Sequence, residues 1–231
     1  MTILAIDTSF TACSAAVLLP GAAKPIQRFE PMARGHAEEL FPMIEAVMAE
    51  ADCDFRELTK IAVTLGPGSF TGVRAGIAAA RGIALAAGLP VVGATSLEVM
   101  ARGCARCLDE DERKGGFAVM YDARRGELYV QHFAKDGVAT GEPRIMDIVE
   151  AFASLPPSIA LAVGSGAVLA AQEAQCHGRP LSAALLGLLP EAGDLAVIAI
   201  ERSPSGEPVS PLYLRLPDAK PQSDKILARA T

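Results

Sequence analysis

The chain has 231 residues, of which 51% are hydrophobic and 21% are charged, and its formal net charge is −6 at pH 7. This composition excludes an intrinsically disordered chain and is typical of one large or two small globular domains. The acidic balance also disfavours direct binding of nucleic acid, which requires locally gathered basic residues.

The beginning of the chain is apolar and strand-like, and it lacks the basic region that opens a signal peptide. No uninterrupted apolar run reaches the roughly 18 residues that a membrane helix needs. We therefore expect a cytoplasmic protein that makes no contact with membranes.

The first half of the chain predicts three antiparallel strands, followed by helices that alternate with parallel strands. The expected strands lie at residues 2–8, 13–19, 24–30, 61–65 and 89–94. The expected helices lie at residues 36–50, 72–87 and 97–107. This order combines an antiparallel meander with right-handed parallel crossovers.

After a charged loop at residues 109–116, the same pattern repeats in weaker form. The expected strands lie at residues 117–121, 127–133, 142–146 and 159–163. The expected helices lie at residues 147–153, 167–175 and 193–202. We therefore predict two ribonuclease-H-like lobes, 1–108 and 109–231, which is the α/β architecture of actin, sugar kinases and chaperone ATPases. The tail from residue 203 is expected to be irregular until 211–215 and frayed at its end.

A glycine-rich turn follows the strand at residues 61–65, and Ser69 or Thr71 can cap the helix after it. Val73 and Arg74 stand where a Walker A loop needs Lys followed by Ser or Thr. The glycine spacing is one residue too long for a dinucleotide fingerprint, and the nucleophile elbow of serine hydrolases is also absent. We interpret the segment as a structural turn, with contact to an anion or a partner as the open alternative.

Five segments together resemble the TsaB family: residues 3–9, 35–44, 66–76, 94–98 and 122–129. The block Gly-Pro-Gly-Ser-Phe-Thr-Gly at residues 66–72, after Ile-Asp-Thr-Ser at 6–9, is the most specific of these. The resemblance is dense up to about residue 130 and thin afterwards.

The resemblance implies a role in placing threonylcarbamoyl on the adenosine 3′ of the anticodon, in tRNAs that read codons beginning with A. It implies that a TsaD-like partner is the transferase and holds the metal, and that a TsaE-like ATPase joins the assembly. It also implies that this chain is a non-catalytic subunit, which meets tRNA only through the complex.

Asp7, Thr8 and Ser9 end the first predicted strand, where an actin-like ATPase holds phosphate and a hydrated cation. Ser9 and the bulky Phe10 crowd the turn that a glycine would open. We interpret these residues as a relic, with nucleotide contact as the alternative. No cofactor is expected in this chain alone, and ATP or ADP at an interface shared with the partner is left open.

His36 is the only histidine in its predicted helix. Metal-binding relatives place a second histidine four residues later, where this chain has Leu40. One clustered histidine does not assemble a metal site without other ligands, so we predict none. The alternative function, an autonomous ATP-dependent kinase-like enzyme or a metallopeptidase of the same superfold, is disfavoured on these grounds.

The helices at residues 36–50 and 72–87 carry more apolar and small residues than one core-facing stripe needs. Small residues allow close helix approach, and methionine makes adaptable contacts. Pro42 should bend or restart the first of these helices. The predicted partner-binding residues are His36, Leu40, Phe41, Ile44, Met48, Gly72, Gly76, Ala79, Ala80 and Ile83.

Two points stay open at this level. The helices' extra apolar residues are also compatible with internal packing, and self-association into a homodimer is the alternative when the partner is absent. Asp122 with Arg124 has three interpretations: a contact that orients the lobes, a contact to the partner, or a plain surface turn.

Overall fold

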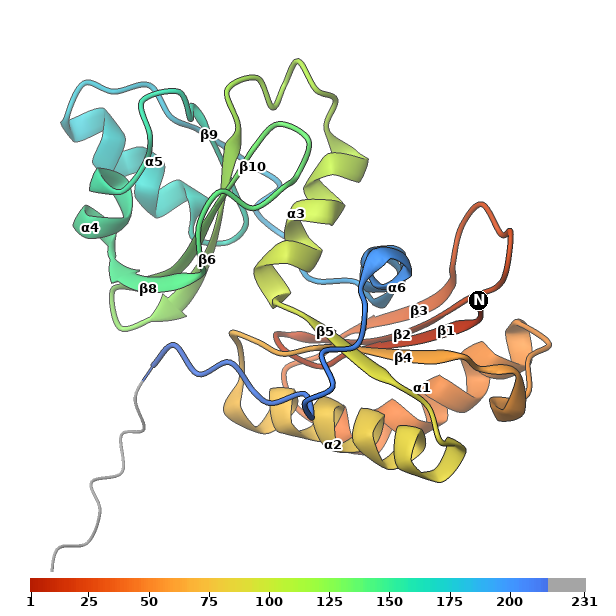
Figure 1. The fold of residues 1–231 in the computed structure, drawn as a ribbon. Helices are drawn as coiled ribbons and strands as arrows, with labels where there is room; N and C mark the ends of the chain where they lie inside the picture. The colour runs from red at the N-terminus through yellow and green to blue at the C-terminus, as the bar shows by residue number, and fades with distance from the viewer. Residues whose placement is uncertain (216–231) are drawn as a thin grey trace, which may run out of the picture.

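A computed structural model describes residues 1–215, and its first five strands form one mixed sheet with the order β3-β2-β1-β4-β5 (Figure 1). The strands are β1 (Ile3–Asp7), β2 (Ala12–Leu18), β3 (Ile26–Pro31), β4 (Lys60–Thr64) and β5 (Val91–Ala94). Strand β1 pairs antiparallel with β2 and parallel with β4. These three central strands are buried along their whole length, as expected for a sheet that is covered on both faces.

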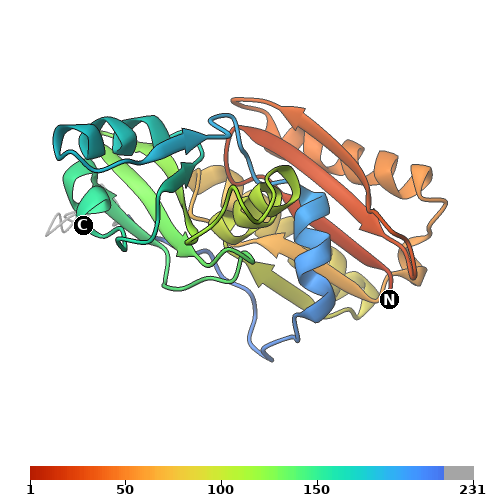
Figure 2. The ribbon, with the colours of Figure 1, turned by 90° about the horizontal axis from the view of Figure 1, so that it is seen from above.

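Helices from both halves of the chain cover this sheet. One face packs against α1 (His36–Glu50) and α2 (Phe70–Ala87), with side chains such as Leu4, Ile6 and Ile61 between them. The other face packs against α6 (Ala192–Glu201), which lies across the strands in Figure 2. We call this sheet with α1, α2 and α6 the first lobe. A short 3₁₀ helix, η1 (Phe55–Glu57), precedes β4.

The second sheet repeats the strand order of the first, as β8-β7-β6-β9-β10. Its strands are β6 (Phe117–Arg124), β7 (Glu127–Phe133), β8 (Arg144–Asp147), β9 (Leu161–Val163) and β10 (Ser182–Ala184). One face packs against α4 (Ile148–Ala153) and α5 (Ala167–Cys176), and the other against α3 (Ser96–Cys107). The predicted fold class, two ribonuclease-H-like lobes, is confirmed.

Three details differ from or add to the prediction. The short strand β10 was not predicted, and α1 runs through Pro42 without a restart. Helix α6 lies in the range assigned to the second lobe, yet it packs on the first sheet. The boundary after residue 108 itself stays a prediction, and the tail beyond residue 215 lies outside the described residues. Within residues 1–215, no helix combines the length and apolarity needed to cross a membrane.

Candidate functional site

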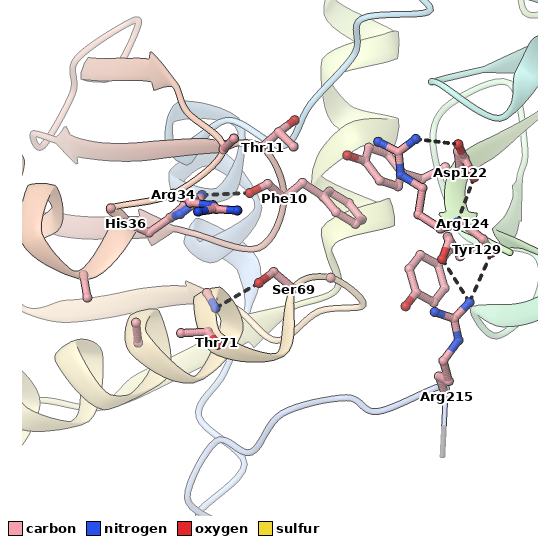
Figure 3. A pocket seen from close by; sticks show the side chains of 18 of the residues that line it. Phe10, Thr11, Arg34, His36, Ser69, Thr71, Asp122, Arg124, Tyr129 and Arg215 are labelled. Atoms are coloured by element: carbon pink, nitrogen blue, oxygen red, sulfur yellow. Dashed lines mark hydrogen bonds and ion pairs between the residues drawn. The ribbon is translucent and has the colours of Figure 1, made fainter. Parts of the chain in front are cut away.

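A cavity of about 600 Å³ opens between the two lobes (Figure 3). The turn between β1 and β2, the start of α1 and the start of α2 form its first-lobe side. The hairpin between β6 and β7 and Arg215 form the opposite side. The polar and aromatic side chains that line it include Phe10, Arg34, His36, Thr71, Tyr121, Arg124, Tyr129 and Arg215.

Asp7, Thr8 and Ser9 do not line this cavity, because all three are buried beneath it. The Ser9 hydroxyl donates a hydrogen bond of 2.6 Å to Asp7 Oδ1, and the Thr64 hydroxyl donates to the same oxygen. Thr8 Oγ1 donates to the carbonyl of Gly72 at 2.7 Å. Three of the polar groups predicted to contact nucleotide are therefore engaged in holding this lobe together.

Burial raises the pKa of the Asp7 carboxyl to about 6, although the hydrogen bonds from Ser9 and Thr64 oppose the rise. Its Oδ2 atom is buried and accepts no hydrogen bond from the described residues. Such an oxygen is costly when charged, which is the physical reason for the raised pKa.

Phe10 fills the interlobe side of the β1–β2 turn. Its ring is 5% exposed and stacks on Tyr121 of the second lobe, with the centroids 3.7 Å apart and the planes 14° apart. A second contact, tilted, joins Phe10 to Tyr129 at 6.4 Å. The His36 ring donates from Nε2 to the Phe10 carbonyl at 2.9 Å (Figure 3). One aromatic residue thus connects the start of α1 to the second lobe.

The glycine turn packs directly against the residues that follow β1. A Cβ atom on Gly68 would lie 2.2 Å from the Ser9 carbonyl oxygen, and one on Gly72 would lie 2.1 Å from the Thr8 carbonyl oxygen. Ser69 caps α2 by accepting a hydrogen bond from the Gly72 amide at 3.3 Å. These contacts agree with the interpretation of a structural turn, in which glycine is needed for close backbone approach.

Residues 212–215 form a second connection between the lobes. The Leu212 amide donates to the Leu65 carbonyl of the first lobe at 2.7 Å. Arg215 Nη2 donates to the Ala123 carbonyl of the second lobe at 2.9 Å and also contacts the Glu127 carboxylate. Among the alternatives for Asp122 and Arg124, the structure gives a local pair of 3.3 Å within one hairpin.

The predicted partner-binding residues divide by burial. Seven of them are buried within the first lobe, which agrees with the alternative of internal packing, and their contact with a partner stays a prediction: Leu40, Ile44, Met48, Gly72, Gly76, Ala79 and Ala80. Phe41 is 52% exposed, and Ile83 is partly exposed. The partly exposed His36 is engaged with Phe10, as described above.

An apolar groove of about 510 Å³ lies between α1 and α2, and Leu40, Phe41, Ala79 and Ile83 belong to its lining. The prediction missed the remaining residues of this groove: Ala37, Ala75, Ala78, Gly82 and Ala86. For the four of these residues that lie on α2, the signal is the spacing of small residues, which recur every three or four positions along one face of the helix.

The side chains suited to metals are dispersed. Within the described part of the chain, no three His, Cys, Asp or Glu residues gather closely enough to hold a metal ion. His36 uses its Nε2 for the Phe10 carbonyl rather than facing a second ligand.

Comparison with known proteins identifies the family. A family model described as TsaD, tRNA N6-adenosine threonylcarbamoyltransferase, matches residues 30–180. The Escherichia coli protein named tRNA threonylcarbamoyladenosine biosynthesis protein TsaB is 33% identical over 235 residues, which cover 93% of this chain and 95% of that protein. The chain belongs to the TsaB family.

Solved structures agree with the placement in the TsaB family. A Pseudomonas aeruginosa protein described as similar to peptidase YeaZ superposes with a TM-score of 0.77 at 29% identity, covering 93% of this chain and 99% of that chain. YeaZ from the same organism gives a TM-score of 0.73 at 30% identity, covering 86% of this chain and 91% of that chain. An uncharacterized protein of Mycobacterium tuberculosis is 35% identical over 221 residues, covering 95% of this chain and 94% of that protein.

Proposed function

We propose that this chain is a non-catalytic subunit that binds and activates a TsaD-like transferase. The assembly attaches threonylcarbamoyl to the adenosine 3′ of the anticodon in tRNAs that read codons beginning with A. Membership of the TsaB family supports the pathway, since relatives in that family are named for threonylcarbamoyladenosine biosynthesis. The observation that carries the scaffold role is the apolar groove between α1 and α2.

The groove is suited to helices of another protein. Its α2 side is built from alanine and glycine, which let a second helix approach closely. Phe41 stands 52% exposed at its α1 side, so burial of the part that is still exposed would contribute about 1 kcal/mol. A contiguous apolar surface of this kind marks an interaction site more often than a lone exposed residue does.

The alternative of an autonomous kinase-like enzyme or metallopeptidase is less well supported. Asp7, Thr8 and Ser9 are at most 1% exposed, so phosphate would have no direct approach to those residues. The proposal therefore includes no nucleotide at the end of β1, and the interface with the partner is the alternative location for ATP or ADP.

The rest of the assembly follows from the same proposal. A TsaE-like ATPase completes the complex, and tRNA is held by the complex rather than by this acidic chain alone. When the transferase is absent, a second copy of the chain covers the apolar groove, because that surface would otherwise stay in water.

An omission assay tests the proposal. TsaD- and TsaE-like proteins, and a TsaC-like enzyme that makes the threonylcarbamoyl adenylate, are combined with unmodified tRNA, threonine, bicarbonate and ATP, with and without this chain. We expect threonylcarbamoyladenosine, measured by nucleoside mass spectrometry, only when the chain is present. Equal modification in its absence would refute the scaffold role. Turnover of ATP by the chain alone would favour the kinase-like alternative.

A further inference from the structure

Two aromatic side chains stack on each other at the surface, where the segment after α6 passes beside the first turn of α2 (Figure 1). Phe70, the first residue of α2, and Tyr213 of that segment have ring centroids 5.5 Å apart and planes 27° apart. Phe70 is 59% exposed and Tyr213 is 52% exposed. The guanidinium of Arg74 lies 4.9 Å from the centre of the Phe70 ring. We call these three residues the aromatic platform.

Contacts on both sides of Tyr213 hold its backbone in place. The Leu212 amide donates to a backbone carbonyl of the first lobe at 2.7 Å. Leu214 packs against the hydrophobic cluster between α3 and the second sheet. Arg215 donates to a backbone carbonyl of the second lobe at 2.9 Å. The Tyr213 ring is therefore presented to solvent from an anchored segment.

The surroundings of the platform are polar and basic rather than apolar. Ser69 and Thr71 on either side of Phe70 are exposed, and so is Ser210. The sequence contains no aspartate or glutamate from residue 58 to 97 or from 208 to 215. A hot spot for protein binding is surrounded by contacts that exclude water. Hydroxyls and a guanidinium beside exposed rings instead fit a nucleobase that stacks while its phosphate lies nearby.

We propose that the aromatic platform stacks on an unpaired base of the tRNA that the assembly modifies. The rings supply the stacking surface, and Arg74 contacts a phosphate of the same strand. Bases inside a helical stem are covered by their neighbours, so the bound base comes from a loop or an end of the tRNA. This inference rests on the proposed function and adds a direct contact between this chain and the substrate.

Removal of the Tyr213 ring tests the proposal. The complex of this chain with TsaD- and TsaE-like proteins is prepared with wild type and three variants, and its affinity for unmodified tRNA is measured by filter binding at one salt concentration. We expect Tyr213→Ala to bind about tenfold more weakly. Tyr213→Phe keeps the ring, and Phe55→Ala removes an exposed ring of η1 instead, so both should bind like wild type. Circular dichroism and thermal unfolding verify that Tyr213→Ala remains folded.

A tryptophan at the same position reports on stacking directly. The chain contains no tryptophan, so Tyr213→Trp adds a single indole, and the complex with wild type supplies the background of the partner proteins. We expect tRNA to quench this fluorescence, because a stacked base covers the ring, and ATP at the same concentration to leave it unchanged. Phe55→Trp should respond to neither. Quenching by ATP as strong as that by tRNA would assign the platform to free nucleotide and overturn the proposal.

A protein occupant is tested with the same variants in the absence of tRNA. Calorimetry measures the affinity of Tyr213→Ala for the TsaD-like subunit, and sedimentation equilibrium measures its self-association. A loss in either would show that the rings pack against a protein, which overturns the proposal. Unchanged tRNA affinity in a complex that still modifies tRNA would overturn the platform and leave the proposed function intact. Absence of any binding between wild type and the transferase would overturn the proposed function, and the platform with it.

Discussion

Asp7 is a fully buried carboxyl whose pKa burial raises from 3.8 to about 6. In the unfolded chain it ionises near pH 4, so between pH 4 and pH 6 the folded state keeps a proton that the unfolded state has lost. The free energy of unfolding therefore falls as pH rises through this window, by about 3 kcal/mol at about 1.4 kcal/mol per pH unit of pKa difference. Above pH 6 the loss is complete.

Replacement Asp7→Asn should remove this loss. As the pH rises from 4.5 to 7, we expect the free energy of unfolding of the variant to increase by about 2 kcal/mol relative to that of wild type. Urea unfolding at several pH values measures it. Asp111→Asn, at an exposed position, controls for the removal of one charge. Parallel curves for Asp7→Asn and wild type would show that Asp7 does not titrate in this window.

At the residue scale, the sequence was sufficient to place Asp7, Thr8 and Ser9 at the end of the first strand. It was not sufficient to show that they are enclosed, because enclosure depends on Thr64 and Gly72, which are far away in the chain. Helical periodicity likewise cannot separate an apolar stripe that meets a partner from one that meets its own sheet, which is why Ile44 and Met48 were assigned to the partner.

At the scale of elements, the glycine turn explains why α2 begins where it does. Gly72→Ala would place a methyl group 2.1 Å from the Thr8 carbonyl oxygen, and the clash can be relieved only by a shift of backbone. We expect this change to lower the free energy of unfolding by about 1–3 kcal/mol. Gly82 is in the same helix, and a methyl group added to it would meet no atom within 4 Å. Gly82→Ala should therefore raise stability by up to about 1 kcal/mol.

Urea unfolding of the two glycine variants measures both effects on one helix. The opposite signs distinguish close packing from helix propensity, since propensity alone would make both substitutions stabilising. Stabilisation by Gly72→Ala would contradict the close approach of α2 to the end of β1.

Most elements follow from periodicity and turn signals, because strands β1, β2 and β4 are continuous apolar runs and the helices have clear ends. Strand β10 was not predicted because Ser182–Ala184 is short and has no apolar pattern. The position of α6 was not predicted for another reason. Its sequence predicts a helix, but only the three-dimensional fold shows that this helix packs on the first sheet. Four residues of the α1–α2 groove were among the predicted partner-binding residues: Leu40, Phe41, Ala79 and Ile83.

At the scale of the whole molecule, several contacts join the lobes, among them the packing of α3 against α6, where Arg106 pairs with Asp194 at 3.0 Å. Phe10 stacks on Tyr121, and residues 212–215 run from the Leu65 carbonyl to the β6–β7 hairpin. Separation of the lobes would break the aromatic stack. Since His36 at the start of α1 donates to the Phe10 carbonyl, the helix proposed to bind the partner is in direct contact with this joint.

The aromatic joint can be tested with a pair of phenylalanines. Phe10 is 5% exposed, so Phe10→Ala should lower the free energy of unfolding by about 3–5 kcal/mol. Phe70 is 59% exposed, so Phe70→Ala should change it by only about 0.5 kcal/mol. Hydrogen exchange should also accelerate in β6, around Tyr121, in the first variant alone, because the stack that covers this strand is lost. Equal stability losses, or unchanged exchange in β6, would mean that the lobes are held together without Phe10.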